Sequence, residues 1–173
     1  MRDSPDVRAQ SLNYYQYRKF KLAVLTLFKY LPGVWMLKRR LGTLGSMQGM
    51  AYFQPYGDNR LHYQEQGDAT FGQGKVFSAY RMYVYMYKKE KMEVYCWDQR
   101  EKKSTRLLHT LHFHNVEPTS HTFVATGTHR CADDVYKARY TFFSYNHFQL
   151  NYQVQGPRKD YVIQTHFRKI IEN

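Results

Sequence analysis

Gly156-Pro157-Arg158-Lys159-Asp160-Tyr161 joins two segments in which apolar and polar residues alternate, residues 148–155 and 161–168. A Gly-Pro pair between two period-two segments predicts a β-hairpin, because Gly tolerates a positive φ and Pro fixes the other corner of the turn. Near the other end of the chain, Gly33-Val34-Trp35 begins another extended segment. We expect the first and last strands to be neighbours, so that the sheet closes on itself as an antiparallel barrel.

Alternation with a period of two continues along the whole chain after Gly33. Turn sequences such as Tyr56-Gly57-Asp58-Asn59 and Phe71-Gly72-Gln73-Gly74 separate the alternating segments. We expect strands at residues 34–40, 45–54, 60–66, 75–87, 92–98, 104–113, 121–129, 135–143, 147–155 and 161–168. Short strands joined by short turns predict an up-and-down meander, and a closed or nearly closed barrel of about 8–10 strands holds one small ligand or a packed aromatic interior.

The region before Gly33 has a helical period. Residues 14–30 carry an apolar stripe with the spacing of one helix face, consisting of Tyr17, Phe20, Val24, Leu27, Phe28 and Leu31. Pro32 and Gly33 end this helix, because Pro disfavours helical geometry in the residue before it. We therefore divide the chain into a basic N-terminal extension with a helix, residues 1–31, and an all-β barrel domain, residues 32–173.

The chain is strongly basic, with a formal net charge of +12 and 26 Lys and Arg against 14 Asp and Glu. No acidic residue occurs between Asp6 and Asp58. This charge suits an anionic lipid surface, an RNA or an acidic protein, which the basic N-terminal region would contact. We expect no transmembrane segment, because the longest aliphatic run is far shorter than the ~20 residues that span a bilayer. An intracellular protein follows, and the acid-free N-terminus favours the matrix side of mitochondria.

Gly33-x-Trp35 at the start of the first strand, together with Arg168 near the end of the last, resembles the signature of the lipocalin and wider calycin barrels. In that group a tryptophan sits at the closed end of the barrel and a basic residue of the last strand packs across it. The resemblance implies a calycin-like barrel closed by Trp35 and Arg168. It also implies a small apolar or amphipathic ligand in the interior.

A second set of motifs is more specific. The chain resembles the domain of unknown function family 6314 from about Leu31 to Lys169, and that family brings a fold but no established activity. The matching motifs are Leu61-x-Tyr63-x-Glu65-x-Gly67, Ala79-x-Arg81-x-Tyr83, His129-x-Cys131-x-x-Asp134-x-Tyr136, and Val154-x-Gly156-Pro157-Arg158-Lys159-Asp160-Tyr161 with Thr165 and Arg168.

Catalytic and metal sites are the weaker interpretations of these residues. His129, Cys131 and Asp134 have the chemistry of a nucleophilic triad, but a hydrogen-bond cluster between strands explains them better. His112 and His114 share a strand face, yet with eight histidines in the chain such pairs arise by chance. Both cysteines are expected to be buried thiols without a disulfide. We predict no enzyme activity, no metal and no cofactor.

The Arg158-Lys159-Asp160 turn allows two interpretations. Its cations could clamp a phosphate group, but no glycine-rich loop precedes a helix here. The alternative, which we favour, is that Asp160 pairs with a neighbouring cation and holds the hairpin.

The candidate ligand site is the barrel interior. Its residues are Tyr63, Glu65, Arg81, Tyr83 and His129, with Glu65 and Arg81 expected to form an ion pair that fixes strand register. We predict a non-enzymatic binding module. The other hypothesis is an accessory structural subunit of a large organellar assembly, such as a mitochondrial respiratory complex or a ribosome, in which the barrel contacts protein partners.

Overall fold

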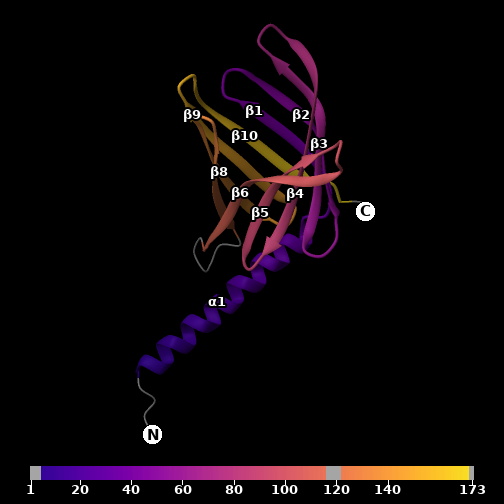
Figure 1. Ribbon diagram of the computed structural model, residues 1–173. Helices are drawn as coiled ribbons and strands as arrows, with labels where there is room; N and C mark the ends of the chain where they lie inside the picture. The colour runs from indigo at the N-terminus through magenta and orange to yellow at the C-terminus, as the bar shows by residue number, and fades with distance from the viewer. Residues whose placement is uncertain (1–4, 116–121, 172–173) are drawn as a thin grey trace.

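The computed structural model describes residues 5–115 and 122–171, and these form one helix followed by a closed barrel of ten strands. Each strand pairs with its neighbours in sequence, as Figure 1 shows. The all-β, up-and-down barrel with an N-terminal helix is thus confirmed; residue 121, where the seventh strand was expected to begin, lies outside the described residues. The elements are α1 (Pro5–Tyr30), β1 (Gly33–Leu41), β2 (Gly45–Pro55), β3 (Arg60–Phe71), β4 (Lys75–Lys88), β5 (Lys91–Asp98), β6 (Lys103–Asn115), β7 (Phe123–Cys131), β8 (Asp134–Ser144), β9 (His147–Gly156) and β10 (Lys159–Lys169).

The barrel closes between β1 and β10, as the sequence predicts. These strands run antiparallel, with Trp35 opposite Lys169 and Leu41 opposite Ile163. β9 and β10 form the expected hairpin, in which Gly156 faces Lys159 across a two-residue turn. Closure leaves less unpaired strand edge than an open sheet would expose, although β6 and β7 pair only over residues 112–115 and 123–126.

Side chains alternate between the barrel interior and its outer surface. On β1, Trp35, Leu37 and Arg39 are buried, whereas the intervening Met36 and Lys38 are exposed. The inward face of each strand follows from the same register, because residues opposite one another point to the same side of the sheet.

One end of the barrel is sealed by aromatic side chains. Trp35 packs edge-on against Phe148 at 5.0 Å between ring centroids, and Phe148 stacks on Phe167 at 4.3 Å. The last turn of α1 and the residue after it cover this end, with Leu27, Phe28 and Leu31 buried in the same core. Burying several aromatic rings in one cluster excludes water and stabilises this end of the barrel.

The helix is longer than predicted and uses only part of its apolar stripe. Its C-terminal end contacts the barrel, where the Trp35 indole donates to the Leu31 carbonyl at 2.9 Å. Its N-terminal part projects away from the barrel (Figure 1), and Tyr17, at 50% exposure, is not buried. Nowhere in residues 5–115 and 122–171 is there a helix with the length and apolar character needed to cross a bilayer.

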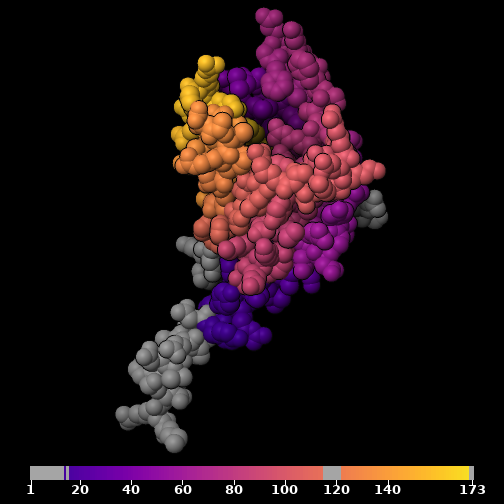
Figure 2. Space-filling view, viewed as in Figure 1, coloured from indigo at the N-terminus to yellow at the C-terminus, as the bar shows by residue number. Residues whose placement is uncertain are grey.

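The opposite end of the barrel is open. Along the inward face of β4, exposure rises from Tyr85 at 5% to Phe77 at 53%. Along β7 it rises in the same direction, from the buried Ala125 to the exposed Cys131. Figure 2 shows the resulting hollow at the top of the molecule, between the β9–β10 hairpin and the β3–β4 hairpin. We call this end the mouth of the barrel.

The residue over Trp35 is Lys169, so the prediction of Arg168 is wrong. Arg168 is exposed and lies opposite Met36 on the outer face. The side chain of Lys169 passes over Gly33, which has a φ of 133°. A Cβ on Gly33 would lie 2.7 Å from Lys169 Cε. Gly33 is therefore required both by its backbone conformation and by the passage of the lysine.

The side chain of Lys159 joins the β9–β10 hairpin to the β7–β8 hairpin at the mouth. Lys159 Nζ donates to Asp134 Oδ2 at 2.6 Å and to the Tyr136 hydroxyl at 3.0 Å. The prediction that Asp160 holds the hairpin is therefore wrong, since Asp160 is exposed and Asp134 forms this ion pair.

The reason for glycine at position 156 is also different from the predicted one. Gly156 is not among the described residues with positive φ, but a Cβ there would lie 1.9 Å from Asp134 Oδ1. The remaining signature residues of the turn, Pro157 and Arg158, are exposed, and Tyr161 is half-buried.

Candidate functional site: the barrel interior

A buried ion pair lies halfway along the barrel. Arg39 of β1 binds Glu65 of β3 in a bidentate arrangement, with distances of 2.6 and 2.8 Å. Tyr63 donates its hydroxyl proton to the same carboxylate, and Arg39 Nε donates to Thr165 Oγ1 of β10 at 2.9 Å. All four side chains are at least nine-tenths buried. The group forms a polar floor beneath the mouth, in which each buried charge is paired.

The contacts within the polar floor keep both Arg39 and Glu65 ionised. Burial alone would raise the pKa of Glu65, but the hydrogen bonds and charge of Arg39 lower it below its usual value. Burial alone would lower the pKa of Arg39, but the hydrogen bonds and charge of Glu65 raise it. Burial and then the Glu65 charge raise the pKa of Tyr63 well above its usual value, so this hydroxyl stays protonated and acts as a donor.

Four further tyrosine rings narrow the interior beside the polar floor. Tyr83 stacks on Tyr63 at 6.0 Å, and the hydroxyls of Tyr85 and Tyr140 lie 2.9 Å apart. Tyr152 completes the group, and burial raises the pKa of all four phenols. The cavity left between these side chains and the polar floor is about 20 Å³. This is room for about one water molecule.

Arg81 lies at the boundary between the polar floor and the mouth. Its guanidinium Nε is 3.9 Å from Glu65 Oε1, and its side chain is 52% exposed. The predicted ion pair of Glu65 with Arg81 is thus a long contact, and Arg39 is the main partner. Sequence reasoning missed Arg39, although Trp35, Leu37 and Arg39 alternate on one face.

Two histidines line the other side of the interior. His129 is half-buried, and its ring lies 6.0 Å from that of Tyr136. His109 is 2% exposed, and neither of its ring nitrogens has a hydrogen-bond partner among the described residues. Burial, followed by the nearby His129, lowers the pKa of His109 to about 4. Buried polar groups are nearly always paired, so an unpaired buried imidazole is notable.

The other predicted constellations are dispersed. Asp134 binds Lys159, and Cys131 is exposed at the rim of the mouth, so the expectation of a buried thiol is wrong there. His114 points outward and bonds to Thr126 Oγ1 at 2.7 Å. Within the described part of the chain, no three His, Cys, Asp or Glu side chains are grouped as a metal site.

Of the five predicted interior residues, the structure places two in the floor and three nearer solvent. Tyr63 and Glu65 are each 2% exposed and are occupied with one another and with Arg39. Arg81, Tyr83 and His129 are the members that remain partly accessible. This arrangement can bind a molecule in the mouth, to which it offers a cation and phenol groups.

The fold and interior together define an antiparallel β-barrel with one sealed and one open end. The model of the family of unknown function DUF6314 matches residues 31–169. The chain therefore belongs to this family, as its motifs predict. A search of the curated proteins gave no match.

Several solved structures are similar to this chain. The S-type phycobiliprotein lyase CPES from Guillardia theta is similar over 87% of this chain and 94% of that chain, with a TM-score of 0.59 and 10% identity. A redesigned β-barrel is similar over 83% of this chain and 95% of that chain, with a TM-score of 0.43 and 15% identity. A redesigned β-barrel bound to DFHBI is similar over 82% of this chain and 97% of that chain, with a TM-score of 0.42 and 16% identity. The likeness to the lyase is one of fold.

Proposed function

We propose that this protein is a non-enzymatic binding module that holds a small amphipathic molecule in the mouth of the barrel. One observation carries the proposal: the barrel is sealed by Trp35 and α1 at one end and open at the other, where the inward-facing side chains are accessible. A barrel of this size is a scaffold on which a site for one small ligand can be built.

The size of the interior sets the position of the ligand. Because the cavity beside the polar floor is only about 20 Å³, an organic molecule rests above the floor rather than within it. There it contacts Arg81, Tyr83 and His129, while Tyr63 and Glu65 support the site from below. The shared fold of the phycobiliprotein lyase is compatible with such a site but does not identify its ligand.

The chemistry of the mouth favours a ligand with an anionic group on an aromatic body. Arg81 has only a long contact with a carboxylate and is half exposed, so its guanidinium has free donors. Tyr83, which stacks on Tyr63, provides a ring against which an aromatic body packs. An anion bound to Arg81 gains charge-assisted hydrogen bonds.

Fluorescence titration with 1-anilinonaphthalene-8-sulfonate tests this function, because that probe has an aromatic body and one sulfonate. We expect saturable binding that Arg81→Ala weakens about tenfold, the loss of one charge-assisted hydrogen bond of about 1.4 kcal/mol. Arg100→Ala, at an exposed turn, is the matched control and leaves binding unchanged. N-phenyl-1-naphthylamine, which lacks the sulfonate, binds the wild-type protein and Arg81→Ala with the same affinity. If Arg81→Ala binds the sulfonate probe as tightly as the wild-type protein does, this site is excluded.

A second function, an accessory subunit of an organellar assembly, is favoured by the projecting helix. Tyr14, Tyr17 and Leu22 are at least 50% exposed on α1. Such side chains are typical of a surface that a partner covers. Purification from the native source followed by light scattering distinguishes the two functions. A stoichiometric complex supports the subunit, whereas a monomer that carries a small molecule contradicts it.

A further inference from the structure

The outer surface of β1 and β7–β10 carries charge of almost one sign. Six exposed cations project from it, and none pairs with a carboxylate in the described part of the chain. At the outward-facing positions of these five strands the only carboxylate described is Asp160, at the start of β10. The cations are Lys38, Arg40, Arg130, Lys137, Arg139 and Arg168. A face of this kind attracts polyanions and raises their rate of association.

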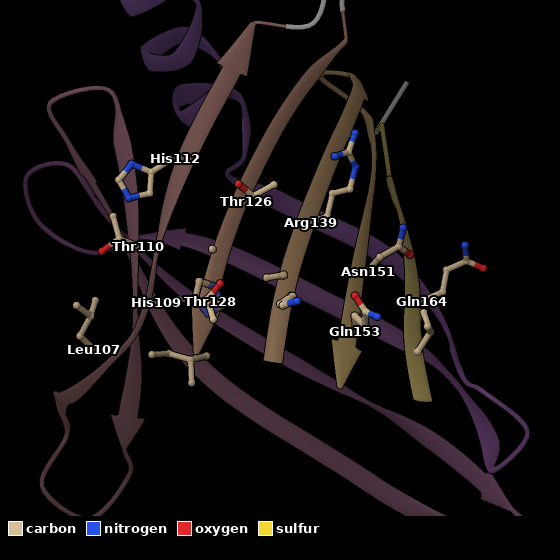
Figure 3. Close-up of a pocket in the computed structure, with 15 residues that line it drawn as sticks. Leu107, His109, Thr110, His112, Thr126, Thr128, Arg139, Asn151, Gln153 and Gln164 are labelled. Atoms are coloured by element: carbon tan, nitrogen blue, oxygen red, sulfur yellow. The ribbon is translucent and has the colours of Figure 1, made fainter. Parts of the chain in front are cut away.

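Part of this surface is hollowed into a groove. The groove extends over β6–β10 with a volume of about 920 Å³, and Figure 3 shows the side chains that line it. It lies on the outside of the barrel, because Lys137 and Arg139 are exposed whereas Ala138 and Tyr140, which alternate with them, are buried. We call it the outer groove; it is separate from the mouth and does not include Arg81.

The lining of the outer groove is mixed: Lys137, Arg139, two histidines and six amide or hydroxyl side chains lie beside the apolar Leu107, Leu108, Ala138 and Val162. The amide and hydroxyl side chains come from four strands and include Thr126, Thr128, Asn151, Gln153 and Gln164. Among the lining residues that the structure describes, none carries a carboxylate. Lys and Arg, with Thr, Asn and Gln, are the side chains that contact the phosphates and sugars of nucleic acids.

We propose that the outer groove binds the sugar–phosphate backbone of a nucleic-acid strand. Lys137 and Arg139 neutralise phosphates, and the amides and hydroxyls bond to phosphate and sugar oxygens. The hollowed surface with its cations and hydrogen-bonding groups favours a strand over a membrane, because binding at a bilayer surface needs a continuous apolar face that inserts among the lipids. This site is independent of the ligand proposed for the mouth.

Fluorescence anisotropy with labelled polyuridine measures the binding. We expect Lys137→Gln/Arg139→Gln to weaken it at least tenfold at about 0.1 M salt. The slope of log affinity against log salt falls by about 1.4, because two phosphate contacts are lost. Arg18→Gln/Lys29→Gln removes the same charge from exposed positions of α1 and is the matched control, with an expected change under about twofold. Arg81→Ala leaves RNA affinity unchanged and so separates this site from the mouth.

Three results would overturn the proposal. The first is the absence of RNA binding by the wild-type protein at low salt. The second is an equal loss in the groove and helix variants, which would mean that net charge alone attracts RNA. The third is a groove variant that loses binding to mixed phosphatidylcholine–phosphatidylserine vesicles but keeps its affinity for RNA. Equal affinity for polydeoxythymidine supports backbone contacts through phosphate, and a preference for polyuridine supports contacts to the 2′-hydroxyl. Thermal melting confirms that each variant is folded.

Discussion

The ammonium group of Lys169 lies over the indole ring of Trp35, with Nζ 5.6 Å from the ring centroid. The same ammonium donates to the Tyr30 carbonyl at 2.6 Å, in the last turn of α1. Helix C-termini leave carbonyl groups without partners, and a cation there is favourable. One side chain thus joins the last strand, the first strand and the helix, and it holds the sealed end of the barrel together.

Replacing Lys169 by Ala should therefore destabilise the protein. We expect a loss of about 1–2 kcal/mol in the free energy of unfolding, from one cation–π contact and one hydrogen bond to a carbonyl. Urea denaturation measures it. Arg168→Ala is the matched control, because Arg168 points outward, and its effect should stay within about 0.5 kcal/mol. Equal losses in the two variants would contradict the assignment of Lys169.

The error over Arg168 could have been avoided from the sequence. Residues 161, 163, 165 and 167 form the apolar face of the last strand, and the next residue on that face is Lys169. A shift of one residue moves a side chain to the other face of a sheet. The fold class, the strand order and the closure of the barrel could be predicted from the period-two alternation and the turn sequences, because each depends on local patterns.

The polar floor was harder to predict because it depends on distant pairs. Arg39 and Glu65 lie 26 residues apart and do not face one another across a single strand pair. Alternation places both side chains inside the barrel, but their contact depends on barrel curvature. Gly156 shows the same limit, because Asp134, which excludes a Cβ there, belongs to a different hairpin.

Gly156→Ala should disrupt the link between the two hairpins at the mouth. The new Cβ would collide with Asp134 Oδ1, so Asp134 must move away from Lys159. We expect a loss of about 1–3 kcal/mol, typical of overpacking. A double-mutant cycle with Asp134→Ala provides the control, because without the carboxylate the added methyl group should cost less. Strictly additive effects would show that the collision is not the cause.

Arg39→Met should leave Glu65 buried without its main partner. We expect it to lower the free energy of unfolding by about 3–5 kcal/mol, as measured by urea denaturation. Arg39→Met/Glu65→Leu should recover most of this loss, because no buried charge then remains. Arg81→Met is the matched control and should cost less than about 1 kcal/mol, since Arg81 is half exposed and its contact is long. A double variant as unstable as the single one would mean that the pair itself stabilises the barrel.

His109 should make the stability of the barrel depend on pH. The unfolded chain takes up a proton at this histidine below about pH 6.5, whereas burial delays uptake in the folded protein to about pH 4. Stability is therefore lost as the pH falls between these values, by about 3 kcal/mol for this group. His109→Leu removes the contribution, and the exposed His112→Leu serves as the matched control. Urea midpoints across this pH range measure it, and a constant difference between wild type and His109→Leu would show that the imidazole is solvated in the folded state.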